Sequence, residues 1–218
     1  MLLRTVLLAP LMALSVVSGG NAAIILTATL TNSQEVPPTV PTTSTGAPRP
    51  ASFGTATFVL NDAMTAMTVD ATIFNIDFTG AQTPDPNDNL TAAHIHAPAP
   101  PGVTAPVVWG FFGTPFNDTM PTDTVITPFP TGVGGTVSTK WDAPEGNNTT
   151  LTAQLPNILA DLSYINFHTV QFPTGEIRGQ IIASVPEPST LSLLGFGIAG
   201  LAGIGLVRSR RQKRDAQA

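Results

Sequence analysis

Apolar and polar residues alternate along most of this chain with a period of two, and this alternation limits the fold more than any other feature. Side chains two apart on a strand point to the same face, so the pattern predicts strands with one buried face. Nine short segments show it: 24–30, 53–60, 67–74, 92–96, 107–112, 136–141, 151–155, 164–169 and 177–183. Only 156–162 predicts a helical turn, and Pro, Gly, Asn and Asp fill the spaces between segments. We therefore predict an all-β fold, an antiparallel Greek-key-like sandwich.

The first 23 residues have the three parts of a secretory signal peptide. Arg4 gives a basic start, an apolar stretch follows, and small residues suited to cleavage after Ala22 or Ala23 end the segment. The sequence therefore predicts export, with residues 24–184 as the exported domain.

The last segment, 185–218, has the composition of a membrane anchor. Residues 191–207 carry no charge, which is just enough for the roughly 17–25 residues that cross a bilayer. A basic tail, 208–214, follows directly and is expected to stay in the cytoplasm. We predict one C-terminal transmembrane helix over 191–207, since a buried core helix would show an amphipathic period that this run lacks.

The exported domain is strongly acidic and has no cysteine. It has twelve acidic residues and three basic ones, Arg49, Lys140 and Arg178, which gives a formal charge of −9. Such a surface repels nucleic acid and anionic lipid, so neither is an expected partner. Without cysteine, disulfides, thiolate metal sites and a cysteine nucleophile are all excluded.

Three segments of the domain stand out as motifs: Asn-Ser-Gln-Glu-Val-Pro-Pro at 32–38, Thr-Ala-Ala-His-Ile-His-Ala-Pro at 91–98, and Tyr-Ile-Asn-Phe-His-Thr at 164–169 with Pro-Thr-Gly-Glu-Ile-Arg-Gly-Gln-Ile at 173–181. In this order they resemble the CHRD domain, the chordin-type module. The chain departs from that family in a long Pro/Thr insertion after Pro38 and in Ala97, where the family usually has glycine. The resemblance implies a β-sandwich over about 24–183 and brings no agreed biochemical activity.

In the tail, Val185, Pro186, Glu187 and Pro188 precede the apolar run and the basic cluster. This motif and the order of the parts are similar to the PEP-CTERM sorting signal. The resemblance implies a Gram-negative bacterium, transient anchoring in the inner membrane, and cleavage near this motif by an exosortase. It also implies a place at the cell surface or in an extracellular matrix such as a biofilm, with exopolysaccharide or matrix proteins as partners.

All three histidines of the chain fall within the domain motifs. His94 and His96 share one face of a strand with Ile95 turned to the core, and His168 shares a face of a later strand with Asn166 while Phe167 turns inward. If the two strands are neighbours, three imidazoles meet, a ligand set that suits zinc or copper with a fourth position for water or a carboxylate. The alternative interpretation is that the histidines hydrogen-bond backbone or carboxylate groups and fix loops.

Two further sets of residues have mainly structural interpretations. Glu176 and Arg178 lie two apart on a predicted strand, where we expect them to form a structural ion pair. Trp109 is expected to pack in the core, although an exposed Trp109 beside a polar groove would suit a polysaccharide.

Catalysis has weak support in the sequence. A His-x-His strand on a sandwich resembles copper–zinc superoxide dismutase, but that site uses more histidines than this chain has, and its disulfide needs cysteine. The serine-nucleophile motif Gly-x-Ser-x-Gly is also absent. We therefore expect an exported, non-catalytic surface or matrix module with a three-histidine metal site as one option. A metal-dependent enzyme on a superoxide-dismutase-like sandwich is the alternative.

Overall fold

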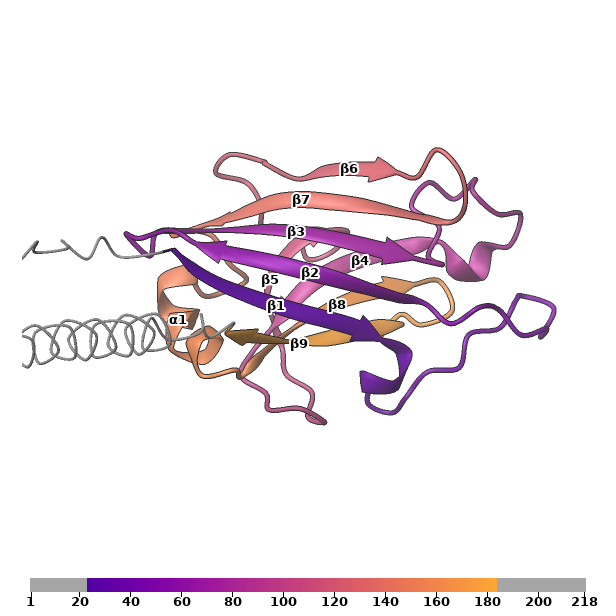
Figure 1. Ribbon diagram of the computed structural model, residues 1–218, viewed down its shortest axis with the longest axis horizontal. Helices are drawn as coiled ribbons and strands as arrows, with labels where there is room; N and C mark the ends of the chain where they lie inside the picture. Colours follow the sequence, from indigo (N-terminus) through magenta and orange to yellow (C-terminus); the bar gives the residue numbers. More distant parts are fainter. Residues whose placement is uncertain (1–22, 184–218) are drawn as a thin grey trace, which may run out of the picture.

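The computed structural model describes residues 23–183, which form an antiparallel β-structure with one short α-helix (Figure 1). The nine strands are β1 (Ile24–Thr31), β2 (Phe53–Leu60), β3 (Ala66–Phe74), β4 (Leu90–His96), β5 (Val107–Phe112), β6 (Val125–Pro128), β7 (Gly134–Asp142), β8 (Ser163–Thr169) and β9 (Ile177–Ala183). The helix is α1 (Leu151–Leu159), and two 3₁₀ turns are η1 (Asn32–Gln34) and η2 (Pro86–Asp88).

The strands form one sheet in the order β5-β4-β8-β9-β1-β2-β3-β7-β6. Every pair is antiparallel, and the pairs β1–β9, β4–β8 and β3–β7 join strands that are distant in sequence. The sheet curls on itself, so that β1, β2, β3 and β7 lie in front of β4, β5 and β8 in Figure 1. This curl buries the inner faces of both halves in one core.

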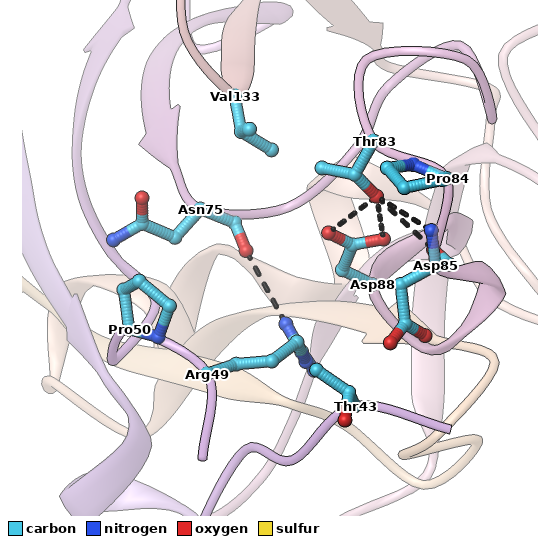
Figure 2. A pocket seen from close by; sticks show the side chains of 9 residues that line it. All are labelled: Thr43, Arg49, Pro50, Asn75, Thr83, Pro84, Asp85, Asp88 and Val133. Carbon is cyan, nitrogen blue, oxygen red and sulfur yellow. Dashed lines mark hydrogen bonds between the residues drawn. The ribbon is translucent and has the colours of Figure 1, made fainter. Parts of the chain in front are cut away.

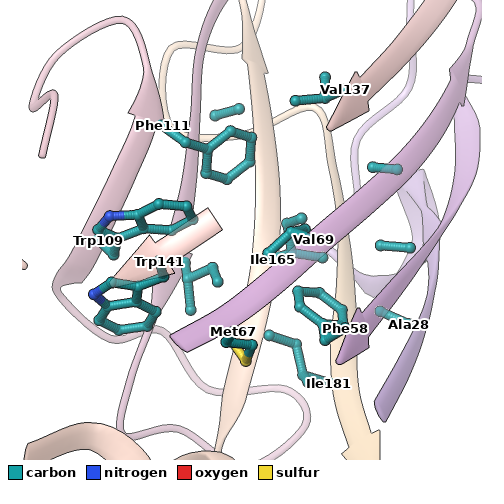
Figure 3. Close-up of a cluster of buried hydrophobic side chains, with 14 of the residues drawn as sticks. Ala28, Phe58, Met67, Val69, Trp109, Phe111, Val137, Trp141, Ile165 and Ile181 are labelled. Carbon is teal, nitrogen blue, oxygen red and sulfur yellow. The ribbon is translucent and has the colours of Figure 1, made fainter. Parts of the chain in front are cut away.

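The core is aliphatic and aromatic, and it joins the two halves of the curled sheet (Figure 3). Trp109 of β5 stacks on Trp141 of β7 with ring centroids 5.3 Å apart. These two strands are the first and the eighth in the strand order, so only the curl of the sheet brings them together. Trp109 is fully buried, which confirms its expected role in packing. All core residues lie between Leu26 and Ile181, so this segment has the single continuous core expected of a domain.

The structure confirms the all-β antiparallel class, and eight of the nine predicted segments are strands. The sandwich differs from expectation in one respect, because its two layers are parts of one continuous curled sheet. The predicted strand at 151–155 is wrong: it is the first part of α1, with Thr150 as the N-cap. The short edge strand β6 was not predicted, because Pro128 ends it and its four residues carry little pattern.

The predicted signal peptide, the motif at Val185–Pro188 and the predicted membrane segment lie outside the described residues, apart from Ala23. Within residues 23–183, no helix has the length and apolar character needed to cross a membrane.

Candidate metal centre

The three histidines meet on the outer face of two neighbouring strands. His94 and His96 lie on β4 and His168 on β8, and these strands pair directly in antiparallel register. The neighbouring Ile95 and Phe167 point into the core and are fully buried, as the alternation predicted. The histidines are also buried, with 3, 7 and 6% of their surface exposed. Both faces of these strands are therefore covered.

The imidazole rings are close enough to share one ion. One nitrogen from each ring can be chosen so that all three lie within 4.8 Å of one another. His94 Nδ1 and His168 Nε2 are 3.1 Å apart. Two ligand nitrogens of a tetrahedral zinc ion are separated by about 3.3 Å, given Zn–N bonds of about 2.0–2.1 Å. No Asp or Glu among residues 23–183 joins this group of ligand atoms, so the carboxylate considered from the sequence is not found there.

Backbone carbonyl groups fix the tautomers of two rings. His96 Nδ1 lies 2.9 Å from the carbonyl oxygen of Ala105, and His168 Nδ1 lies 3.0 Å from that of Pro173. A carbonyl oxygen only accepts, so both Nδ1 atoms carry hydrogen and donate. A hydrogen bond of this kind on the second nitrogen orients the ring of a metal-binding histidine.

All three histidines are held neutral. Burial, followed by the neighbouring His168 and His96, lowers the pKa of His94 to about 3. Burial is also the main cause that lowers the pKa of His96 to about 4 and that of His168 below its usual range. Neutral imidazoles are the form that binds a metal.

Counting protons shows that nitrogen lone pairs lack partners here. With hydrogen on Nδ1, neutral His96 and His168 have a lone pair on Nε2. His168 Nε2 therefore presents a lone pair to His94 Nδ1, and the two atoms form a hydrogen bond only in the tautomer of His94 that carries its proton on Nδ1. His96 Nε2 is buried and has no hydrogen-bond partner within residues 23–183. Buried polar atoms without partners are costly, so these residues fit a bound cation.

The covering of the site depends on a glycine in β5. A Cβ atom on Gly110 would lie 1.8 Å from the carbonyl oxygen of Pro115 and 3.0 Å from Cδ2 of His94. Only glycine therefore lets the loop at 113–117 approach this closely. On the other side, the ring of Tyr164 stacks on His96 at 4.7 Å, and the Arg178 guanidinium lies 4.5 Å from the centre of the Tyr164 ring.

A buried acid that the sequence did not single out lies beside Asn166, the cross-strand neighbour of His94. Glu35 is 6% exposed, and burial raises its pKa to about 7 against the lowering effect of Arg178. Its Oε1 has no hydrogen-bond partner among the described residues, and the same holds for Oδ1 of Asn166, the cross-strand neighbour of His94. Gly175, with φ +128°, lies directly over both side chains. The motif position of Glu35 at 32–38 was the one available sign of its importance.

Glu176 and Arg178 do not pair with each other, contrary to the expectation from their spacing. Glu176 is fully buried and forms an ion pair with Arg49 at 2.9 Å. Arg178 donates to the carbonyl oxygens of Gln34 at 2.5 Å and Val103 at 3.0 Å. Each residue is structural, but the partner of Glu176 comes from a distant loop that strand spacing cannot reveal.

Two comparisons identify the parts of the chain. The family model of the CHRD domain matches residues 26–181, and the model of the PEP-CTERM protein-sorting motif matches residues 184–211. No curated protein and no solved structure matches the chain. The sorting motif marks an exported protein of Gram-negative bacteria that is anchored transiently in the membrane, processed by an exosortase and sorted to the cell surface.

Proposed function

The chain belongs to the CHRD domain family, and from this premise we propose that it is a non-catalytic surface module that holds one zinc or copper ion. The ion would bind to His94, His96 and His168, and the module would act in the extracellular matrix. The observation that carries this proposal is the meeting of three buried, neutral imidazoles whose ligand nitrogens lie within 4.8 Å.

The chemistry of the donor set favours zinc or copper. Neutral imidazole nitrogen suits both ions, whereas calcium and magnesium prefer oxygen ligands. When His94 carries its proton on Nε2, the two facing nitrogens of His94 and His168 are both free to bind one ion. The carbonyl groups of Ala105 and Pro173 already hold the other two rings in the tautomer that presents Nε2.

The surroundings favour a structural role for the ion over a catalytic one. All three ligands are at least nine-tenths buried, and they come from two strands that also carry core side chains on their other face. Through Ala105 and Pro173, the same rings fix the loops that follow β4 and β8. A bound ion would clamp these loops to the sheet, which is what a surface module needs for a stable shape outside the cell.

The first experiment is to measure the metal content of residues 23–184, purified without a histidine tag, by mass spectrometry after incubation with zinc or copper. The test variant is His94→Ala/His96→Ala/His168→Ala. Asp62→Ala serves as the control, because the side chain of Asp62 is exposed and has no hydrogen bond or ion pair within residues 23–183. We expect one equivalent of metal in the wild type and in the control, and none in the test variant.

Stability provides a second readout. A ligand at 100 times its dissociation constant stabilises the folded state by about 2.7 kcal/mol, so saturating metal should raise the melting temperature of the wild type and leave that of the triple variant unchanged. Equal metal content in the wild type and a folded triple variant would contradict the site. Turnover of superoxide by the metal-loaded protein would instead support the enzyme alternative.

A further inference from the structure

Three phenylalanine rings form a row on the outer face of the sheet, remote from the histidines in strand order. Phe53 of β2 and Phe74 of β3 are cross-strand partners, and their rings stack at 4.8 Å with an angle of 13°. Phe129, which follows β6, extends the row, with its ring 5.1 Å from that of Phe74. Phe53 and Phe74 are 48% and 37% exposed. The row therefore presents aromatic surface to the solvent.

A row of threonines runs beside the aromatic row on the same face. Thr55 and Thr72 lie two residues from Phe53 and Phe74 respectively, so their side chains project to the same side. Thr29, Thr55, Thr72, Thr136 and Thr127 are successive cross-strand partners across five strands. None of these five hydroxyl groups forms a hydrogen bond within residues 23–183.

Threonine alone is no sign of a binding site, because it is a common residue on exposed strands. The phenylalanines are more informative. A cross-strand aromatic pair stabilises a sheet, but three neighbouring rings that stay partly exposed also form an apolar patch of the kind that marks an interaction surface. Their π faces are negative and attract the C–H groups on the flat side of a sugar ring. Trp109, which the sequence offered as a sugar platform, is buried and is not available for this role.

A cavity of about 330 Å³ opens at the same end of the sheet (Figure 2). Its wall includes Asn75, which directly follows Phe74, and Val133, whose carbonyl oxygen accepts a hydrogen bond from the Asn75 amide at 3.0 Å. Asp88 faces the cavity and is 4% exposed. Within residues 23–183, the one other side chain that donates to its two carboxylate oxygens is Thr83, whose hydroxyl group lies at 3.0 and 3.1 Å. Asp88 therefore has lone pairs left to accept hydrogen bonds from a hydroxylated ligand.

We infer that this face binds a neutral, hydroxyl-rich polysaccharide, with sugar rings stacked on the Phe53–Phe74–Phe129 row and hydroxyl groups bonded to the threonine row and to Asp88. The formal charge of −9 on the domain disfavours an anionic polymer. A peptide strand cannot add to β2 or β3, because both are paired on each side. Flat aromatic rings beside free hydroxyl groups match a sugar chain, which is apolar on its ring faces and polar at its edges.

This inference gives a partner class to the matrix role in the proposed function and rests on that role. It does not depend on the metal, because β2 and β3 are separated from β4 and β8 in the sheet by β9 and β1. Binding to the polysaccharide is therefore expected to survive removal of the metal.

The test is a pull-down of the full-length protein, in a detergent without a sugar headgroup, with three insoluble neutral polymers: cellulose, chitin and a β-1,3-glucan. Alginate beads serve as the anionic comparison, and each binding measurement is repeated with a chelator. Phe53→Ala/Phe74→Ala removes two rings of the row. Phe116→Ala is the matched control, because Phe116 is also exposed, at 43%, but lies outside the row. Thr55→Val/Thr72→Val removes two hydroxyl groups and leaves the side-chain shape unchanged.

We expect the wild type and Phe116→Ala to bind at least one neutral polymer equally well, with or without chelator. Loss of two stacking rings should weaken binding by about tenfold or more, and the valine pair should also weaken it. The inference would be overturned if the wild type bound none of the three neutral polymers or if it bound alginate more strongly than these polymers. Equal binding by the wild type and both double variants would overturn it too. Loss of binding with the chelator would do so as well, because it would tie binding to the metal site. Absence of metal from a protein that still binds the polymer would count only against the metal site.

Discussion

Glu176 shows how one residue fixes several distant segments. Its carboxylate accepts from Arg49 at 2.9 Å, from Thr169 at 2.6 Å and, on the other oxygen, from the hydroxyl group of Ser52. The side chains of Glu176 and Arg49 are 0% and 5% exposed. The pair thus ties the loop before β2 to the turn between β8 and β9.

Removal of this carboxylate should be costly. Glu176→Ala removes the ion-pair partner of the buried Arg49, and breaking a buried pair in this way costs about 3–5 kcal/mol. We expect such a loss in the free energy of unfolding measured by urea titration. The exposed Asp62→Ala, whose side chain has no hydrogen bond or ion pair in residues 23–183, should change stability by less than about 0.5 kcal/mol. Similar effects for the two variants would show that the pair adds nothing.

The buried histidines make the metal-free protein sensitive to acid. In the unfolded chain they take up protons near the ordinary pKa of 6.5, whereas in the folded protein His96 and His94 do so only near 4 and 3. Between these values the unfolded state binds more protons, so stability falls as the pH falls.

Glu35 has the opposite effect on stability. Its pKa is raised from 4.5 to about 7, so its contribution to stability is lost as the pH rises through that range.

We predict that the chelator-treated wild type loses on the order of 5 kcal/mol between pH 7 and pH 4.5 from His94 and His96, roughly 2.5 kcal/mol from each. The measurement is urea unfolding of the wild type and of His94→Ala/His96→Ala/His168→Ala at both pH values. The variant lacks these groups, so the loss on acidification should be smaller in the variant by about this amount. Equal losses in both proteins would mean that the histidines do not cause the acid sensitivity.

At the scale of elements, β4 and β8 differ from the strands of the front layer. In β2 the burial alternates along the strand, whereas every residue of β8 is buried. The outer face of β4 and β8 is covered by loops that reach it through Gly110 and Gly175. These strands can therefore hold polar side chains away from water, and that is why the histidines lie there.

Helix α1 illustrates a local signal that outweighs a pattern. Its first residues alternate as in a strand, but Thr150 accepts a hydrogen bond from the amide of Ala153 and so begins a helix, while Leu151 and Ile158 pack in the core. Thr150→Ala should destabilise the protein by about 1 kcal/mol, measured as a lower midpoint in urea. Thr150→Ser retains the capping oxygen and should stay close to the wild type. An unchanged midpoint in Thr150→Ala would mean that the cap contributes nothing to stability.

At the scale of the whole molecule, the domain and the sorting segment are separate parts. The core ends at Ile181, and the sorting motif begins at residue 184. The curled sheet contains all strands of the described part of the chain, so its stability does not need the tail. Sorting and folding should therefore be separable by mutation.

Deletion of 185–218 should give a folded, soluble domain that is exported but misdirected. The fraction of protein on the cell surface is the measurement, and we expect a severe loss. As a control, replacement of Pro186, Glu187 and Pro188 by alanine keeps the membrane segment and should leave uncleaved protein in the inner membrane. Normal amounts of the truncated protein on the surface would contradict the sorting function.

The sequence by itself determined eight of the nine strands, the inward and outward directions of side chains such as Ile95 and Phe167, and the presence of a sorting signal. These follow from local physics: a period of two, turn residues, and the composition of the tail. The inward positions of Ile95 and Phe167 and the limits of β2, β5 and β9 were all correct for this reason.

Only the tertiary structure decided which strands are neighbours. The pairing of β4 with β8 brought His168 to His94, and the curl of a single sheet stacked Trp109 on Trp141. The tertiary structure also brought Arg49 to Glu176 and placed the ring of Phe53 beside that of Phe74. Pairing between distant segments depends on the burial of the whole core, and a local pattern does not carry that information.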